Sequence, residues 1–274
     1  MKKASESLFG FSKGLTLSTT FFMKTVLQIT EIFEPITLEE MDGVKLMNRV
    51  DTKFAFSIAE LYTFLPELSR DYRILEINDI RIPNYESLYF DDRDFSFYHD
   101  HHNGRTNRYK VRIRKYVESN LFFLELKHKH KGRTDKKRIL TDGFSQLLNT
   151  EHLLFLSKYL TRGIDLKPNL WNSFNRITLV NNHSSERLTL DFNIRFHWED
   201  EHQTFENLVI AELKQDVLNR NSAFYELMKR LMIRPYRLSK YCIGTMEIYH
   251  NGNIKYNRFK EKLMKLKSIN AHVA

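Results

Sequence analysis

The stretch Asn107-Arg108-Tyr109-Lys110-Val111-Arg112-Ile113-Arg114-Lys115-Tyr116 carries a cation at every second position. Because side chains alternate between the two faces of a β-strand, this period predicts a strand with one charged face and one apolar face. The charged face holds Arg108, Lys110, Arg112 and Arg114. Four like charges in one row repel one another, so the row must lie in water or face something strongly anionic.

The composition supports an anionic partner. The 274 residues include 43 Lys and Arg against 34 Asp and Glu, and the net charge of +9 favours nucleic acid, phosphate compounds or a membrane surface as the partner. A hydrophobic content of 42% is normal for a globular protein. The 9 Gly and 5 Pro argue against long linkers and a glycine-rich phosphate loop. The single cysteine, Cys242, and the lack of any run of ~20 apolar residues predict a cytoplasmic protein.

Alternating charge recurs along the chain and predicts an antiparallel sheet. Further strands are predicted over residues 48–56, 72–77, 86–91, 95–99, 121–131, 174–180, 187–196 and 208–214. Single acidic residues stand among the cations, at Glu125, Asp191 and Glu212, in a pattern that suits metal coordination.

Helices are predicted between the strands. Ser57 is expected to cap a helix over 58–68, and Thr37-Leu38-Glu39-Glu40 to begin another. Further helices are predicted over 144–160, 222–232, 239–248 and, as a solvated helix or tail, 257–274. Residues 1–22 are expected to be an ill-ordered extension, residues 132–142 a charged loop, and His99, His101 and His102 part of a loop.

Two architectures fit the charged faces. In the first, an antiparallel sheet exposes its charged face to water and packs its apolar face on helices. In the second, a closed barrel turns the charged faces inward as a wet, basic tunnel and packs its apolar faces under the helices. Such a tunnel would attract a polyanion strongly.

Seven motifs occur in a fixed order and carry a resemblance. They are Arg49-Val50-Asp51-Thr52-Lys53-Phe54, Tyr89-Phe90-Asp91, Tyr98-His99-Asp100-His101-His102-Asn103-Gly104, Lys110-Val111-Arg112-Ile113-Arg114, Phe123-Leu124-Glu125-Leu126-Lys127, Ala211-Glu212-Leu213-Lys214 and Ser239-Lys240-Tyr241. Over roughly residues 45–250 this set resembles the VTC domain, the polyphosphate polymerase branch of the CYTH-like triphosphate tunnel metalloenzyme superfamily. The resemblance implies an α+β fold in which a closed antiparallel β-barrel with a charged interior is flanked by helices. It divides the chain into an N-terminal extension and helix (1–44), a tunnel domain (45–250) and a basic C-terminal helix or tail (251–274).

The resemblance also implies an activity. The expected enzyme is an ATP-dependent polyphosphate polymerase that transfers the γ-phosphoryl group of ATP to a growing polyphosphate chain with Mn²⁺ or Mg²⁺. Its partners would be ATP and polyphosphate, with a separate membrane partner left open and nucleic acid not expected. A triphosphate hydrolase of the same fold and a non-enzymatic binder of polyphosphate or nucleotide remain alternatives.

Site residues follow from the matched motifs and the shared charged faces. The transfer step is assigned to Lys53, Arg112, Arg114 and Lys127. Substrate binding is assigned to Arg108, Lys110, Lys129, Arg176, Lys214 and Lys240, and metal binding to Glu212 and Glu125. Many superfamily triphosphatases begin with a Glu-x-Glu-x-Lys strand, and here Arg49 replaces the first glutamate. That change favours polyanion binding over hydrolysis with several metal ions.

Overall fold

A curled sheet, antiparallel along its main path, dominates the computed structural model, which describes residues 25–42, 49–130, 133–161, 165–250, 252 and 254–271. Its main path runs β2-β11-β9-β8-β4-β5-β6-β7. In that order the strands are Val50–Ser57, Leu208–Gln215, Glu186–Trp198, Lys167–Asn181, Asn84–Asp91, Arg108–Tyr116, Leu121–His130 and Arg133–Thr141. Three short strands lie off this path: β10 (Glu201–Phe205) pairs with β9, β3 (Tyr72–Leu75) pairs with β8, and β1 (Pro35–Ile36) pairs with β3.

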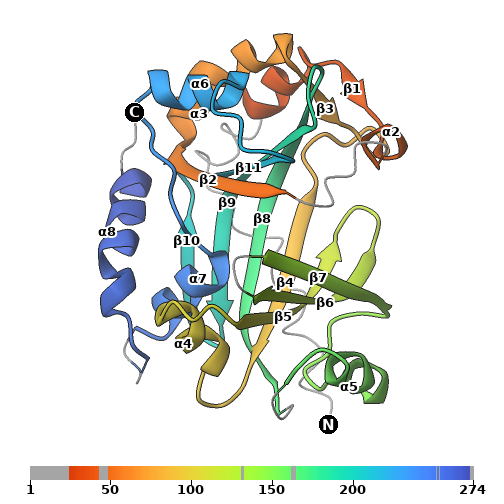
Figure 1. Ribbon diagram of the computed structural model, residues 1–274, viewed down its shortest axis with the longest axis vertical. Helices are drawn as coiled ribbons and strands as arrows, with labels where there is room; N and C mark the ends of the chain where they lie inside the picture. The colour runs from red at the N-terminus through yellow and green to blue at the C-terminus, as the bar shows by residue number, and fades with distance from the viewer. Residues whose placement is uncertain are drawn as a thin grey trace.

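The sheet is open. Within the described residues no hydrogen-bonded pairing joins β2 to β7, the two ends of the main path, so the prediction of a closed barrel is wrong. The long strands β8 and β9 link an arm made of β2 and β11 to an arm made of β4 to β7 (Figure 1). Most β7 side chains are exposed, and its sequence Arg133–Thr141 places charges on both faces. Such an edge remains stable in water without a partner strand.

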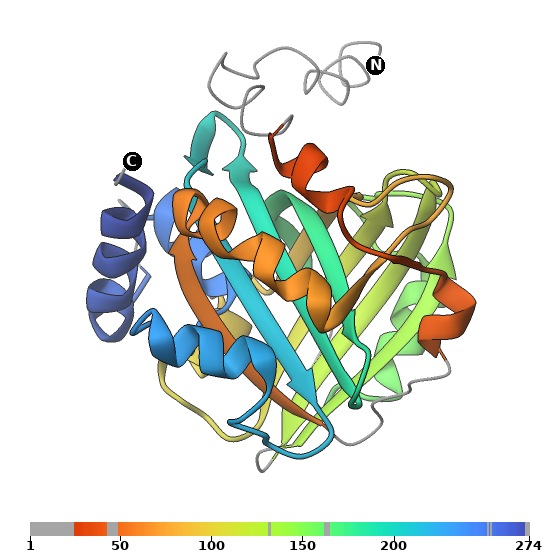
Figure 2. The ribbon, with the colours of Figure 1, turned by 90° about the horizontal axis from the view of Figure 1, so that it is seen from above.

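Helices cover the outer face of the curl. The helices α3 (Ile58–Phe64) and α6 (Ala223–Arg230) pack on the β2–β11 side, where Phe54 and Phe56 are buried (Figure 2). The helix α5 (Thr150–Ser157) contributes to a second core, in which Tyr109, Val111 and Ile113 of β5 are at most 1% exposed. The apolar face predicted for the 107–116 stretch is therefore confirmed.

The inner face is partly filled by α7 (Lys240–Ile248), supported by α4 (Ser96–His102) and α8 (Asn257–Ala271). Helix α7 lies against β8, β9 and β10. Gly244 allows this approach, because a Cβ there would lie 2.3 Å from the ring of Phe196. Ala55 of β2 and Ile210 of β11 belong to the same core. The face on which α7 packs is thus the face that carries Lys53, two residues before Ala55, and Glu212, two residues after Ile210.

Several local predictions are confirmed. Ser57 caps α3, as predicted, through a capping box with Glu60. The helix predicted over 239–248 is α7, at whose start Ser239 accepts the Cys242 N–H. The predicted 58–68 helix changes at Leu65 into the 3₁₀ segment η2 (Leu65–Arg70), where Pro66 lies at the start. The helix that begins after Thr37 is α2 (Leu38–Asp42).

Three element predictions are wrong. Residues 133–141 of the predicted loop form β7. Because this strand carries charges on both faces, its sequence lacks the alternation of polar and apolar residues that predicts a strand. The predicted 95–99 strand lies in α4, because the Asp91 carboxylate accepts the N–H groups of Phe97 and Tyr98. The predicted 144–160 helix is reduced to α5, which Asn149 caps. The predicted extension 1–22 lies outside the described residues. No helix in the described part is long and apolar enough to cross a membrane.

Candidate phosphate site

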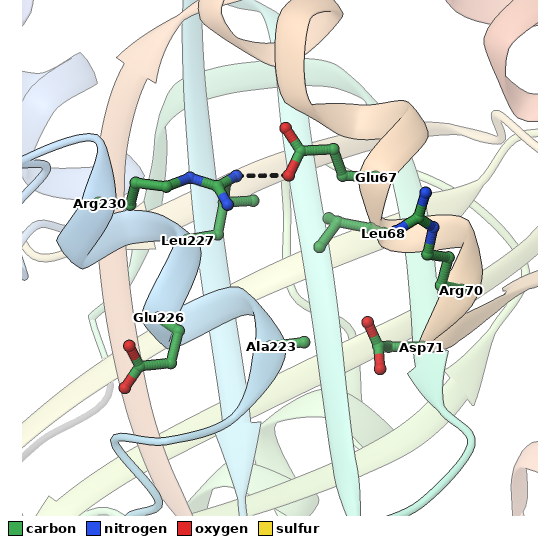
Figure 3. Close-up of a pocket in the computed structure, with 8 residues that line it drawn as sticks. All are labelled: Glu67, Leu68, Arg70, Asp71, Ala223, Glu226, Leu227 and Arg230. Atoms are coloured by element: carbon green, nitrogen blue, oxygen red, sulfur yellow. Dashed lines mark hydrogen bonds and ion pairs between the residues drawn. The ribbon is translucent and has the colours of Figure 1, made fainter.

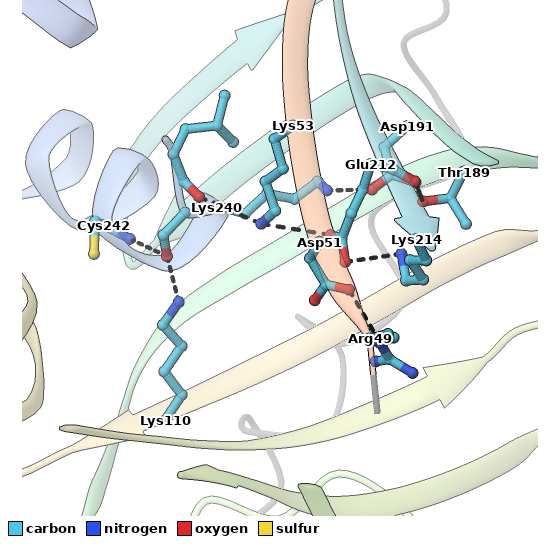
Figure 4. A network of polar contacts seen from close by, with 12 residues as sticks. Arg49, Asp51, Lys53, Lys110, Thr189, Asp191, Glu212, Lys214, Lys240 and Cys242 are labelled. Carbon is cyan, nitrogen blue, oxygen red and sulfur yellow. Dashed lines mark hydrogen bonds and ion pairs between the residues drawn. The ribbon is translucent and has the colours of Figure 1, made fainter. Parts of the chain in front are cut away.

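Three carboxylates on the inner face each bind two cations. The first is Glu212, which lies opposite Lys53 in the β11–β2 register. Its Oε2 is 3.4 Å from the Lys53 Nζ, and its Oε1 is 2.8 Å from the Lys214 Nζ (Figure 4). Lys53 also donates a hydrogen bond to the Leu238 carbonyl, just before α7. This arrangement brings together Lys53, which was assigned to the transfer step, Lys214, which was assigned to substrate binding, and the predicted metal ligand Glu212.

The second carboxylate is Asp191 on β9. Its two oxygens accept from the Arg176 guanidinium at 2.5 and 2.8 Å, and the Lys240 ammonium donates to the same carboxylate. Asp191 is 2% exposed. Both cations were assigned to substrate binding from the sequence. Asp191 was identified from the sequence as an acidic residue among cations. Its pairing with both Arg176 and Lys240 was missed, because these three residues are far apart in the chain.

The third carboxylate is Glu125 on β6, also 2% exposed. Its Oε2 accepts from two Arg112 nitrogens at 2.8 and 2.7 Å, and its Oε1 is 2.5 Å from the Lys136 Nζ. Arg112 also donates to the Tyr89 hydroxyl at 3.0 Å. Lys136 was missed because its strand was predicted to be a loop. The metal role of Glu125 stays a prediction.

Cations from the two arms of the sheet meet across the curl. Lys127 on β6 interacts electrostatically with Glu212 on β11 and Lys53 on β2, although β6 and β2 are far apart in strand order. Lys110 on β5 donates to the Ser239 hydroxyl at the start of α7, 2.6 Å away (Figure 4). The predicted tunnel residues are therefore neighbours even though the sheet does not close.

Two predicted substrate residues lie toward the end of this row of cations. Arg108 pairs with Lys129 in the β5–β6 register, and Arg237 interacts electrostatically with Lys129. Within the described residues, no carboxylate lies within 4 Å of either Arg108 or Lys129. Arg114, the remaining predicted residue, is 7% exposed and lies near the Ser87 hydroxyl and the rings of Tyr85 and Phe174.

Cations keep the three carboxylates ionised. Burial alone would raise the pKa of Asp191, but Arg176 and Lys240 outweigh it and hold that pKa well below its usual range. In the same way Arg112 lowers the pKa of the buried Glu125 carboxyl. The pKa of Glu212 is also lowered, against the effect of burial, chiefly by Lys214 and Lys53.

Some lysines at the site have a pKa that lies close to neutral pH. Burial lowers the pKa of Lys110 to about 7, and the nearby Lys53 and Lys127 cations act in the same direction. Burial likewise lowers the pKa of Lys127 and of Lys240 to about 8. An anion that enters the site would favour the charged form of each lysine.

These lysines predict a pH dependence of stability. Between pH 7 and 10 the unfolded chain retains a proton on Lys110 that the folded protein loses, so the free energy of unfolding should increase with pH. We expect Lys110 to contribute an increase of about 2 kcal/mol from pH 7 to 9 in ligand-free protein, measured by urea unfolding. In Lys110→Met the increase should be smaller, and an identical slope would show that Lys110 does not titrate in this range.

The residues around Glu212 could supply some of the ligands of a divalent cation, with the other ligands coming from the phosphate oxygens of the enzyme's substrate. Within the described residues, no group of three or more His, Cys, Asp or Glu side chains could hold a metal ion alone. Asp51 lies opposite Lys214, so its strand position is diagonal to Glu212. One or two carboxylates together with phosphate oxygens are a usual ligand set for Mg²⁺. Asp51 also pairs with Arg49, whose Nε is 3.0 Å from the Asp51 Oδ1.

Helix α4 lies beside this network, because His101 interacts electrostatically with Lys110 and Arg108. His99 and His101 belong to α4 rather than to a loop. A cavity of about 300 Å³ lies between η2 and α6 on the outer side of the sheet, and the Arg230–Glu67 ion pair crosses it (Figure 3). Its lining consists of Glu67, Leu68, Arg70, Asp71, Ala223, Glu226, Leu227 and Arg230.

Comparison with known proteins gives one family match. The model of the family described as VTC domain matches residues 48–249. No curated protein matches the chain.

Solved structures show distant likenesses. A candidate adenylate cyclase from Bacillus halodurans is 15% identical with a TM-score of 0.43, covering 70% of this chain and 94% of its own. A plant protein from Hippeastrum, described as an adenylyl cyclase candidate with a dominant triphosphatase activity, is 13% identical with a TM-score of 0.42, covering 73% and 97%. A conserved protein from Pyrococcus furiosus is 14% identical with a TM-score of 0.40, covering 71% and 99%. At these scores the structures add no argument about activity.

Proposed function

Since the chain belongs to the VTC domain family, we propose that it transfers the γ-phosphoryl group of ATP to a growing polyphosphate chain. One observation carries the proposal beyond the family match. Lys127 and Lys53, from opposite arms of the curled sheet, both interact with Glu212, so a bound anion would meet cations on more than one side.

The chemistry of phosphoryl transfer suits such a site. The reaction asks for positioning and charge neutralisation more than for a protein nucleophile. Arg112, Arg114 and Arg176 offer planar forks that match phosphate oxygens, and lysines offer mobile point charges. The acceptor is the ionised terminal phosphate of the chain, so the site needs no strong general base.

A divalent cation completes the proposed site. Glu212 is the carboxylate that we propose as its ligand, because 19% of its side chain is exposed whereas Glu125 and Asp191 are almost fully covered. Asp51 is a second oxygen donor on the neighbouring strand. When bound, Mn²⁺ or Mg²⁺ would neutralise charge on phosphate oxygens. The protein cations bind and orient the remaining oxygens.

The test is incubation of the purified protein with ATP and Mn²⁺, followed by sizing of the products on a gel. Long phosphate chains are the expected product. Orthophosphate alone would show a hydrolase, and unchanged ATP would show a protein that only binds its ligand.

Glu212→Gln tests the cation ligand. The change keeps the size of the side chain but removes the charge that attracts a hard cation. We expect Mn²⁺-dependent turnover to fall at least about tenfold, by analogy with altered metal sites, while ATP binding measured by calorimetry is largely retained. Glu86→Gln is the control. Glu86 lies on β4, on the face opposite to Ser87, so the change alters a carboxylate outside the site. Wild-type turnover of Glu212→Gln at low Mn²⁺ would remove Glu212 from the site.

Triphosphate hydrolysis is the second candidate. Asp51 and Glu212 lie on paired strands, and two carboxylates could hold a cation that activates water. The Arg49–Asp51 ion pair weighs against this activity, because it supplies a cation where a metal ligand would be needed.

The remaining assignments accompany the proposal. We take residues 45–250 as the catalytic domain, between an extension over 1–44 and a basic tail over 251–274. ATP and polyphosphate are its proposed partners in the cytoplasm, and nucleic acid is not. Fractionation of cells that express the tagged protein would test the location.

A further inference from the structure

Two aromatic rings stack at the base of the cation cluster. Phe174 on β8 and Tyr85 on β4 lie directly opposite in register, with ring centroids 5.3 Å apart and planes inclined by 4°. Phe174 is 3% exposed and Tyr85 is 7% exposed. We call this pair the aromatic platform.

Three cations from three different elements lie over the platform. Arg114 of β5 is 5.4 Å from the Tyr85 centroid and 5.8 Å from the Phe174 centroid. Arg176 of β8 is 4.9 and 5.2 Å from the same two centroids. The Lys240 ammonium of α7 is 4.4 Å from the Phe174 centroid. All three lie within the range of cation–π attraction.

The platform holds these cations in a way that a carboxylate cannot. An aromatic quadrupole attracts a cation but carries no net charge, so the positive potential of the cluster is preserved for a ligand. Asp191, in contrast, neutralises part of the charge of Arg176 and Lys240. Arg114 has no carboxylate within 4 Å among the described residues, so its direct contacts are with the rings and Ser87, while Glu125 attracts it from farther away.

We propose that Phe174 and Tyr85 are positioning residues that hold Arg114, Arg176 and Lys240 in a fixed arrangement around one phosphate group of the substrate. The proposal rests on the proposed function for the identity of that substrate as a phosphate chain. An aliphatic side chain at either position could fill the space but would not attract the cations. The platform therefore sets affinity for phosphate without touching the reacting atoms.

The experiment compares Phe174→Leu with wild type. Binding of inorganic tripolyphosphate is measured by calorimetry, with no turnover required. We expect the Kd to increase about tenfold in Phe174→Leu, because three cations lose a shared support, and Phe174→Tyr to restore binding close to wild type. Tyr85→Leu should weaken binding in the same direction and replaces Phe174→Leu if that variant does not fold.

Phe56→Leu is the matched control. Phe56 is a buried phenylalanine on the outer face of β2, where it packs on Phe64. Its loss should lower thermal stability but leave the Kd for tripolyphosphate unchanged. Wild-type affinity in Phe174→Leu and Tyr85→Leu would overturn the proposal, and so would an equal loss of affinity in Phe56→Leu.

The outcome separates the platform from the proposed activity. If wild-type protein makes no polymer but Phe174→Leu still loses tripolyphosphate affinity, the platform stands and the polymerase proposal fails. If wild-type protein makes polymer while both platform variants bind like wild type, the platform proposal fails alone.

Discussion

Arg114→Ala is expected to abolish polymer synthesis while the protein stays folded. Arg114 lies on the aromatic platform without a carboxylate partner within 4 Å among the described residues, so its removal leaves no buried anion unpaired. Loss of a charge-stabilising donor commonly costs about 100-fold or more in rate. The free energy of unfolding should change by about 1 kcal/mol, because lost packing and relieved repulsion oppose each other. Product sizing and urea unfolding measure the two effects.

Two further variants on β5 serve as comparisons for Arg114→Ala. Lys115→Ala removes a cation from the same strand, but on the opposite face, where Lys115 lies over Phe122. It should leave synthesis unchanged. Arg112→Ala should lose both activity and about 3 kcal/mol of stability, because it removes the guanidinium that pairs with the buried Glu125 carboxylate and leaves Lys136 as its one ion-pair partner among the described residues. If Arg114→Ala were as unstable as Arg112→Ala, Arg114 would have a structural role.

Asp191→Asn is expected to produce a protein that depends on its ligand for stability. The change leaves Arg176 and Lys240 together without their shared carboxylate, and breaking such a buried group costs about 3 kcal/mol. Tripolyphosphate can replace the missing negative charge, and a ligand that binds the native state raises its stability. The increase in Tm with saturating tripolyphosphate should therefore be larger in Asp191→Asn than in wild type.

Asp135→Asn is the control for Asp191→Asn. Asp135 pairs with Lys137 at 3.3 Å on β7, where both side chains are well exposed. Surface pairs of this kind contribute little, so stability should change by less than about 1 kcal/mol. Equal Tm increases with tripolyphosphate in wild type and Asp191→Asn would show that Asp191 does not compete with phosphate for its cations.

Much of the fold could be predicted from local patterns. The period of two in the 107–116 stretch placed Tyr109, Val111 and Ile113 in the core, and all three are buried. Ser57 was recognised as a helix cap from its side-chain chemistry and its place before an amphipathic stretch. Such signals depend on neighbours in the chain, so they survive in the folded protein.

Other elements gave no local signal. Strand β7 carries charges on both faces, because it is an edge strand with little core contact. Helix α4 begins where Asp91, at the end of β4, accepts N–H groups of Phe97 and Tyr98. The openness of the sheet was also hidden, because closure depends on whether two distant edges meet.

The candidate site divides in the same way. The sequence by itself determined which side chains share a charged face, because alternation on a strand fixes the face of Lys53, Arg112 and Glu212. Only the tertiary structure decided which cations each carboxylate binds. It alone also decided that Phe174 and Tyr85 stack on each other and support three of the cations. These contacts join elements that are far apart in the chain. Electrostatic and cation–π attraction depend on the distance between two groups in space. Strand register and the curl of the sheet set that distance.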